Sequence, residues 1–156
     1  MRIYSIDPGN EQSAYVIWNG YKIIDKGIEK NEDLLYLLRI SDIMAIEMMA
    51  SYGMPVGKTT FDTCLWIGRF CQKYLDRWNN VKFEDKIKLI YRKDVKMHFC
   101  HSIKGVKDTN IRQALIDRFG EPGTKKNKGL LYGVTKDIWS ALSIGVYTYD
   151  IFKNNL

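Results

Sequence analysis

Three short apolar segments separated by turn signals open this chain, and their spacing restricts how its first strands can pair. Residues 2–6 (RIYSI) form the first predicted strand, and Asp7-Pro8-Gly9 stops it. Residues 14–18 (AYVIW) and 21–25 (YKIID) form the next two strands. The Asn19-Gly20 pair between them predicts a two-residue hairpin. The three strands are therefore expected to form an antiparallel meander.

Helices and further strands follow the meander. Residues 43–49 (IMAIEMM) are apolar without alternation, which is typical of a central strand covered on both faces. Residues 87–91 (IKLIY) predict a fifth strand. Helices are predicted over residues 32–40, 59–78, 95–101, 109–119 and 136–152, the last with Thr135 as its N-cap. This order predicts an α/β fold with a mixed five-stranded sheet, three strands antiparallel and then two parallel, and helices on both faces. We expect residues 1–156 to form a single domain.

The longest predicted helix carries an apolar stripe at helical spacing, which is expected to face a packing partner. Glycine within this stripe costs about 1 kcal/mol relative to alanine, so it indicates a close approach of another element. The stripe consists of Phe61, Cys64, Leu65, Gly68, Cys71, Leu75 and Trp78.

The positive charge of the chain is concentrated in one part of the sequence. The whole chain has a net charge of +6, but residues 81–136 hold 14 Lys/Arg and 6 Asp/Glu, a local net of +8. The remainder holds 10 Lys/Arg and 12 Asp/Glu, a net of −2. A basic part beside a slightly acidic part indicates a polyanion held next to an acidic centre. A merely solvated basic surface is the alternative.

Several sequence features favour a reduced, cytoplasmic protein without a membrane partner. No apolar run approaches the roughly 20 residues that span a bilayer. The beginning, MRIYSIDPG, does not resemble a signal peptide. Three cysteines cannot form a closed set of disulfides, and their spacing matches no zinc ribbon. The residues HFCH around Cys100 are too closely spaced for a zinc site, so His98 and His101 are expected to have packing or surface roles.

Three acidic residues occupy positions where their chemistry needs explaining. Asp7 ends the first strand, where an Asp before Pro-Gly is also favourable turn chemistry. Asp137 lies in the first turn of the last predicted helix, where the helix dipole favours an acid. Glu47 lies within the covered strand IMAIEMM, where an unpaired carboxylate is costly. Apart from Arg2, no basic residue lies in the first or fourth strand, so a metal ion is the better partner for Glu47.

Taken together, the three acids predict a magnesium site. Hydrolysis of a phosphodiester with two Mg²⁺ ions needs several hard oxygen ligands to hold the ions about 4 Å apart. The first and fourth strands are neighbours in the predicted sheet, so Asp7, Glu47 and Asp137 can converge. They are our candidate catalytic and metal-binding residues.

With these residues in view, the sequence resembles the RuvC family of Holliday junction resolvases, and its phage-borne branch in particular. The motifs are SIDPGNEQSAYVIW at residues 5–18, AIEMM at 45–49 and KDIWSALSIGVYTY at 136–149. The segments KDTNIRQALIDRFG and TKKNKGLLYGVTKD are similar to the basic region of the phage branch.

The resemblance implies a ribonuclease H-like fold, a homodimer, and Mg²⁺ (or Mn²⁺) as cofactor. It implies DNA recombination and repair, through symmetric cutting of four-way junctions in the bacterial cytoplasm or, for a phage protein, that of the host. Asp7 and Glu47 match the first two acids of the family, and Asp137 matches the first acid of its DxxDA helix motif. Ser140 stands where the family has its second helix acid, which is a departure. The long helix over residues 59–78 corresponds to the one at the family's dimer interface.

Basic residues of the second half are candidate DNA contacts, with a solvated surface as the alternative. They are Lys104, Lys107, Arg112, Lys125, Lys126 and Lys128. Other functions stay open at this point: a ribonuclease H-like nuclease acting on flaps, forks or RNA, or a catalytically inactive nucleic-acid binder.

Overall fold

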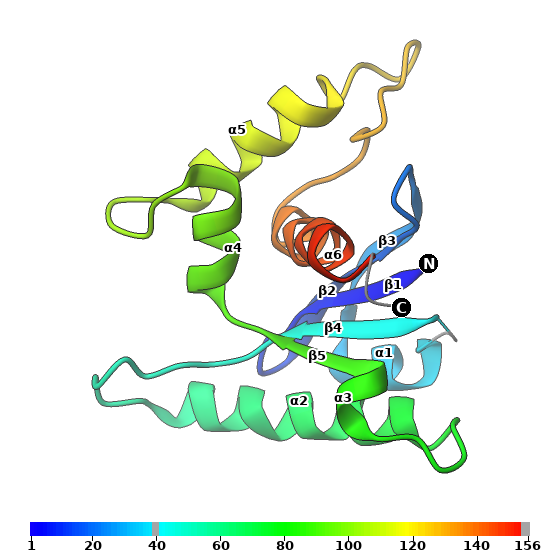
Figure 1. Cartoon of the computed structure of the whole chain (residues 1–156), viewed down its shortest axis with the longest axis vertical. Helices are drawn as coiled ribbons and strands as arrows, with labels where there is room; N and C mark the ends of the chain where they lie inside the picture. The colour runs from blue at the N-terminus through cyan, green and yellow to red at the C-terminus, as the bar shows by residue number, and fades with distance from the viewer. Residues whose placement is uncertain (39–40, 154–156) are drawn as a thin grey trace.

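A mixed five-stranded sheet forms the centre of the molecule in a computed structural model that describes residues 1–38 and 41–153 (Figure 1). Its strand order is β3-β2-β1-β4-β5. The first three strands pair antiparallel, whereas β4 pairs parallel to β1, and β5 parallel to β4. The predicted sheet is therefore confirmed. The strands are β1 (Ile3–Asp7), β2 (Gln12–Trp18), β3 (Ile23–Lys30), β4 (Ile43–Glu47) and β5 (Ile87–Ile90).

The hairpin between β2 and β3 differs from the prediction. Residues 19–22 form a four-residue loop, and β3 begins at Ile23 rather than at Tyr21. The side-chain oxygen of Asn19 accepts hydrogen bonds from the backbone N–H groups of Tyr21 (3.0 Å) and Lys22 (2.9 Å). The asparagine side chain thus closes a longer turn, a local use of Asn that competes with the tight hairpin.

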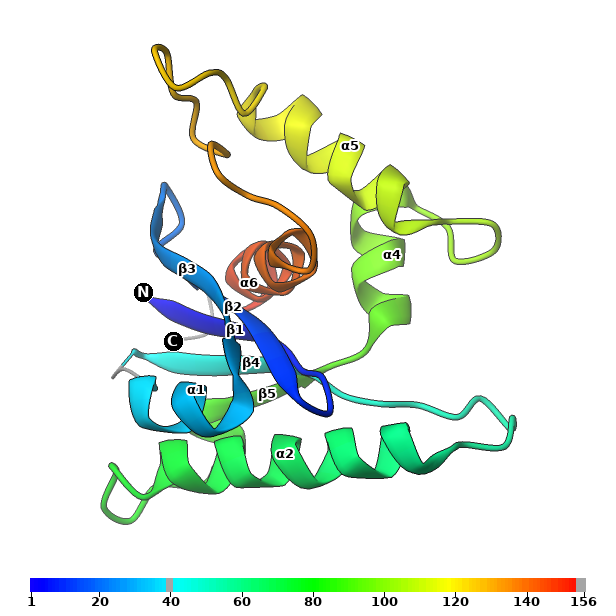
Figure 2. The same ribbon diagram turned by 180° about the vertical axis from the view of Figure 1, so that it is seen from behind.

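Helices cover both faces of the sheet, because successive side chains of each strand point to opposite sides. Tyr4 and Ile6 of β1 belong to the core that α1 (Asn31–Leu37) and α2 (Lys58–Leu75) complete. Ile3 belongs to the core on the other face, beneath α6 (Ile138–Phe152). Figure 2 shows the sheet from behind, with α6 on one side of it and α1 and α2 on the other. The predicted extension of α1 over residues 39–40 lies outside the described residues.

The first half of the apolar stripe on α2, from Phe61 to Gly68, does not pack on the sheet. Phe61 is 60% exposed and Leu65 69% exposed, and nothing lies within 4 Å of a Cβ placed on Gly68. The helix buries a face rotated away from the expected stripe. A polar contact explains this orientation: the hydroxyl of Tyr74 donates to the backbone oxygen of Ser41 at 2.6 Å. The buried residues of the helix are Thr63, Ile67, Phe70, Cys71 and Tyr74.

Two further helices extend over α6 on the side away from the sheet (Figure 1). These are α4 (Arg92–Cys100) and α5 (Asp108–Phe119); a short α3 (Phe83–Lys86), which we did not predict, precedes β5. Asp150 of α6 binds both helices. Its carboxylate accepts two hydrogen bonds from Arg118 (2.5 and 2.9 Å) and lies 2.8 Å from Nε2 of His98. His98 therefore has a packing role, as expected from its sequence context.

Helix α6 packs closely on the middle of β1. A Cβ on Gly145 would come 2.8 Å from Oγ of Ser5 and 3.4 Å from Cβ of Trp18. Only glycine permits this approach. Within the described part of the chain, no helix is long and apolar enough to cross a membrane.

Candidate active site

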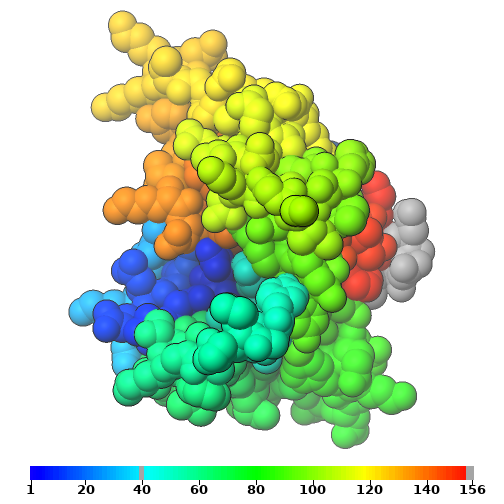
Figure 3. Space-filling view, turned by 90° about the vertical axis from the view of Figure 1, so that its left-hand side faces the viewer, coloured from blue at the N-terminus to red at the C-terminus, as the bar shows by residue number. Residues whose placement is uncertain are grey.

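Asp7 and Glu47 end two neighbouring parallel strands at the same edge of the sheet. Ile6 pairs with Ile46, so the next residue along each strand is an acid. Ile3 and Ala45 belong to the core beneath α6, and the alternation of side chains places Asp7 and Glu47 on that same face. Figure 3 looks at this end of the molecule, where the blue β1–β2 turn lies between the teal loop after β4 and the orange segment before α6.

The turn after Asp7 is held by buried polar groups. The backbone N–H of Gly9 donates to Oγ of Ser13 (3.2 Å), and Ser13 donates to Oδ1 of Asn31 (2.6 Å). Asn31 in turn donates to the carbonyl oxygen of Gly9 (2.9 Å). A Cβ on Gly9 would come 2.3 Å from the carbonyl oxygen of Gln12, so the turn requires glycine. This network, which sequence reasoning missed, fixes the backbone next to Asp7.

The start of α6 differs from the prediction, and the difference places Asp137. We expected the helix to begin at Lys136 after a Thr135 cap, but Lys136 has a left-handed backbone (φ 47°) that interrupts the helix. The helix begins at Ile138, with Asp137 in the N-cap position. The Asp137 side chain makes no capping hydrogen bond to this helix. Helix capping therefore does not explain the acid.

Asp7, Glu47 and Asp137 are close enough to perturb each other electrostatically. Burial raises the pKa of Asp7 to about 7, with further contributions from the negative charges of Glu47 and Asp137. Burial also raises the pKa of Glu47, and Asp108 adds to that shift. Arg92 opposes both shifts, and the Ser140 hydroxyl lowers the pKa of Asp7 through a hydrogen bond. Ser140 therefore belongs to the same site.

Arg92 is the residue of this site that sequence reasoning missed. We expected Glu47 to have no basic partner, but Nη1 of Arg92 lies 4.0 Å from its Oε2. Arg92 is the first residue of α4 and comes two positions after the end of β5. Because β5 runs parallel to β4, the segment after β5 emerges at the edge that holds Glu47. The parallel direction of β4 and β5 is the signal from which the position of Arg92 beside Glu47 could have been predicted.

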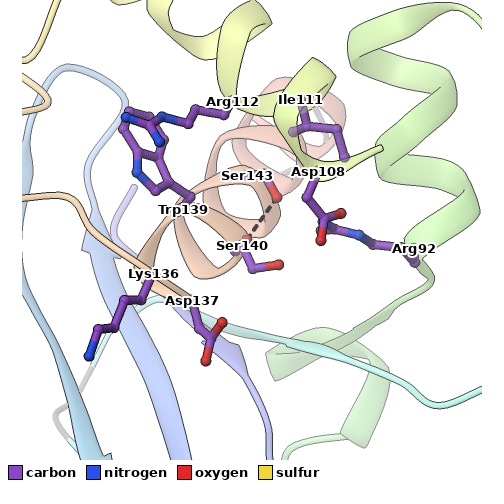
Figure 4. A pocket seen from close by; sticks show the side chains of 9 residues that line it. All are labelled: Arg92, Asp108, Ile111, Arg112, Lys136, Asp137, Trp139, Ser140 and Ser143. Carbon is purple, nitrogen blue, oxygen red and sulfur yellow. Dashed lines mark hydrogen bonds and ion pairs between the residues drawn. The ribbon is translucent and has the colours of Figure 1, made fainter. Parts of the chain in front are cut away.

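A cavity of about 60 Å³ adjoins the acids (Figure 4). The first turns of three helices form its wall, and Ser140 connects it with Asp7. In Figure 4, Arg92 and Asp108 point towards each other, Arg112 lies over the Trp139 ring, and the ammonium group of Lys136 points outward. The lining residues are Arg92, Asp108, Ile111, Arg112, Lys136, Asp137, Trp139, Ser140 and Ser143.

The donor atoms of the site suit a hard divalent cation. Three carboxylates and a hydroxyl supply only oxygen, which Mg²⁺ and Mn²⁺ prefer over soft ligands. Burial raises the pKa of Asp7 first and the charges of Glu47 and Asp137 add to the shift, and a bound cation would offset both effects by favouring the ionised carboxylate. Within residues 1–38 and 41–153, however, no three Asp, Glu, His or Cys side chains lie close enough together to form a complete metal site. The acids converge without forming a finished coordination shell.

The predicted DNA-contacting residues occupy separate places. Arg112 lines the cavity, with its guanidinium 4.8 Å from the centre of the Trp139 ring. The others are exposed and do not line it: Lys104 and Lys107 precede α5, and Lys125, Lys126 and Lys128 lie in the loop between α5 and α6.

Comparison with known proteins gives similarity at the level of structure. No model of a known protein family matches the chain, and no curated protein does. RuvC of T. thermophilus in complex with a Holliday junction substrate is similar at a TM-score of 0.66 and 11% identity, over 94% of this chain and 92% of that chain. A Thermus thermophilus RuvC structure is similar at a TM-score of 0.67 and 11% identity, over 99% of this chain and 96% of that chain. At this identity the likeness shows the fold: the chain has the ribonuclease H-like fold of RuvC, as predicted.

The raised pKa of Asp7 predicts how the stability of the metal-free protein depends on pH. Between about pH 4 and pH 7 the folded chain keeps a proton on Asp7 that the unfolded chain releases, so this residue lowers stability as pH rises through that window. Asp7→Asn should therefore stabilise the protein at pH 8, by more than about 1 kcal/mol because each pKa unit corresponds to about 1.4 kcal/mol. The gain should vanish near pH 4, where Asp7 is protonated in the folded chain. Urea unfolding in the presence of EDTA measures the free energy of unfolding at each pH.

Asp117→Asn on the surface of α5 is the matched control and should leave the pH dependence unchanged. Parallel stability curves for Asp7→Asn and the wild type between pH 4 and pH 8 would contradict the prediction.

Proposed function

We propose that residues 1–156 form one nuclease domain, a divalent-metal-dependent endonuclease that cuts branched DNA, and four-way junctions in particular. The observation that carries this proposal is the convergence of Asp7, Glu47 and Asp137 from β1, β4 and the start of α6. The fold supports it, since one structure with the same fold is described as RuvC in complex with a Holliday junction substrate. A DNA substrate also fits the cytoplasmic location expected from the sequence.

The proposed roles follow from the positions of the side chains. Asp7, Glu47 and Asp137 would hold Mg²⁺ or Mn²⁺, and Ser140 stands where a fourth acid would complete the set. Bound Mg²⁺ would activate a water molecule and stabilise the leaving oxygen, in two-metal hydrolysis of a phosphodiester. The chain itself orients the first acid, because the Gly9–Ser13–Asn31 network fixes the backbone after Asp7. Ser140 lies near enough to lower the pKa of the Asp7 carboxyl group.

Flaps, forks and RNA are the alternative substrates. Helices α4 and α5, which project beyond α6, favour branched DNA over linear RNA. Most of the basic residues of segment 81–136 lie in these two helices and in the loops before and after α5. They form the projecting upper part of the molecule in Figure 1, on the opposite side of α6 from the sheet. A catalytically inactive binder would have no need for three mutually repelling acids, because such a cluster costs stability.

We also propose a homodimer, for which α2 supplies the surface. Phe61 and Leu65 lie one turn apart on its exposed face, and the open side of Gly68 continues that face. Exposed apolar residues in such a stripe mark an interaction site. A four-way junction has approximate two-fold symmetry, which a C2 pair of identical sites matches.

The first functional test is cleavage of a four-way junction by variants of the acids. Asp7→Asn, Glu47→Gln and Asp137→Asn should each lower the cleavage rate by roughly 100-fold or more, since each removes a metal ligand. Junction binding in Ca²⁺, measured by gel shift, should stay near that of the wild type.

Parallel reactions with flap, fork, duplex and RNA substrates identify the preferred substrate. A variant that keeps nearly the full rate in Mg²⁺ would remove its residue from the site. A wild-type protein that cuts none of these substrates would refute the nuclease proposal.

The dimer proposal predicts that Phe61→Ser with Leu65→Ser produces a monomer. Both side chains are exposed, so the free energy of unfolding of the monomer should change by no more than about 0.5 kcal/mol per substitution. Sedimentation velocity gives the state of association. Phe70→Ala, on the buried face of the same helix, should instead destabilise the fold by about 3–5 kcal/mol. A wild-type protein that sediments strictly as a monomer, even with junction DNA bound, would exclude the dimer.

The basic loop between α5 and α6 predicts how DNA affinity depends on salt. If Lys125, Lys126 and Lys128 contact phosphates, replacing all three by Ala should reduce the slope of log K against log[salt] by up to about 3, because each contact releases about one counterion. Fluorescence anisotropy at several salt concentrations measures the slope. Replacing Lys22, Lys30 and Lys73, which lie outside the basic part, is the control of equal charge. An unchanged slope in the loop variant would show that this loop does not contact the DNA.

A further inference from the structure

We propose that the cavity beside the acids binds one phosphate group of the substrate strand, with Arg92 as its central ligand and Asp108 as a counter-ion that the phosphate displaces. The inference rests on the proposed nuclease function and adds a substrate-binding residue to it.

Arg92 has binding capacity that the protein itself does not use. Its Nη1 is fully buried and has no hydrogen-bond partner, although Oε2 of Glu47 lies 4.0 Å away. Its Nη2 is hydrogen-bonded to Asp108. A guanidinium presents a planar fork of donors that matches two oxygens of a phosphate, so one half of this fork is left without an acceptor. An unpaired buried donor is costly unless a ligand completes it.

The present partner of Arg92 is easily displaced. The side chain of Asp108 is 79% exposed, whereas that of Arg92 is only 20% exposed. An ion pair with a solvent-exposed partner contributes about 1 kcal/mol or less. A phosphate can replace the single carboxylate contact and also supply an acceptor for Nη1. Asp108 returns to water at little cost because it is already largely hydrated.

The size and walls of the cavity favour a compact anion. Its volume is about 60 Å³, and one water molecule needs about 10–15 Å³ on this scale, so there is room for a phosphate group. Residues from the first turns of α4, α5 and α6 line it. The positive ends of three helix dipoles therefore lie at its wall and favour negative charge. Arg112 and Lys136 add two further basic residues to the lining, on the other side of the site from Arg92 (Figure 4).

The cavity is next to the atoms that would perform the cleavage. Ser140 and Asp137 both line it, and both are close enough to Asp7 to influence the pKa of its carboxyl group. A phosphate held by Arg92 would thus lie beside the proposed metal ligands. Arg92 then neutralises charge on the phosphate while Asp7, Glu47 and Asp137 remain available to the metal.

A different role for Arg92 needs to be distinguished, because its charge also lowers the pKa of Asp7 and Glu47. If that were its whole role, Arg92→Lys would restore function, since a lysine keeps the charge. High pH would likewise rescue Arg92→Gln by ionising the acids. A phosphate-binding fork predicts neither rescue, because lysine lacks the bidentate geometry.

Titration with inorganic phosphate in EDTA tests binding without relying on nuclease activity. In ¹⁵N NMR spectra, the Arg92 side-chain signal of the wild type should shift and saturate at millimolar phosphate. Arg92→Gln should abolish saturable binding, and Lys93→Gln, which removes the same charge one residue away from the cavity, should retain it. Asp108→Asn should bind phosphate about two- to fivefold more tightly, because the asparagine no longer forms an ion pair that competes with phosphate for Arg92. Equal phosphate affinity in the wild type and in Arg92→Gln would overturn the proposal.

Junction cleavage in Mg²⁺ provides the second readout. Arg92→Gln and Arg92→Lys should both lose roughly 100-fold in kcat at pH 7, a loss typical of removing one donor to a developing negative charge. The loss should persist at pH 9, whereas Lys93→Gln should cut at a rate near that of the wild type. Full rescue by lysine or by high pH would overturn the proposal. If the wild-type protein binds phosphate through Arg92 but cuts no DNA, the phosphate site is supported and only the nuclease function is refuted.

Discussion

The close contact between α6 and β1 is the constraint on which the rest of the structure depends. Gly145 lets the helix backbone lie against Ser5, and no larger residue fits. This contact fixes where the helix begins, seven residues before Gly145, relative to the ends of β1 and β4. The position of Asp137 beside Asp7 and Glu47 is therefore set by van der Waals packing in the core, far from any charged group. Helices α4 and α5 are held in turn to the same helix through Asp150.

The sheet could be predicted because turn chemistry and apolar patterning act over short distances. Asp7-Pro8-Gly9 and the covered strand IMAIEMM contain enough local information to specify strand order. The face of α2 that packs on the sheet could not be predicted, because a second face of the helix, with Ile67, Phe70 and Tyr74, also carries large apolar side chains. A hydrogen bond from Tyr74 to Ser41, across more than thirty residues, favours the second face. The hydrophobic periodicity of the helix sequence does not predict this hydrogen bond.

The acids of the site were predictable for a similar reason, whereas their surroundings were not. A Glu in a covered strand next to the Asp-ending strand needs a chemical explanation, and adjacency in the sheet follows from topology. The partner of that Glu, Arg92, was not predictable from composition because it lies beyond a different strand. The left-handed backbone of Lys136, which delays the start of α6 by two residues, could not be predicted from the sequence either. Such backbone conformations in residues other than glycine depend on the packing around them.

The order of the elements along the chain has a consequence for how the protein is made. Asp7 and Glu47 belong to strands that leave the ribosome early, whereas Asp137 and the helix that positions it are translated last. A domain generally folds as one unit, so this one needs its later elements before its structure is complete. The nascent chain therefore carries two of the three acids through most of translation without the third. If all three are required for cutting, a nascent polypeptide lying close to transcribed DNA is harmless to it until the segment that carries Asp137 has been synthesised and α6 has packed on the sheet.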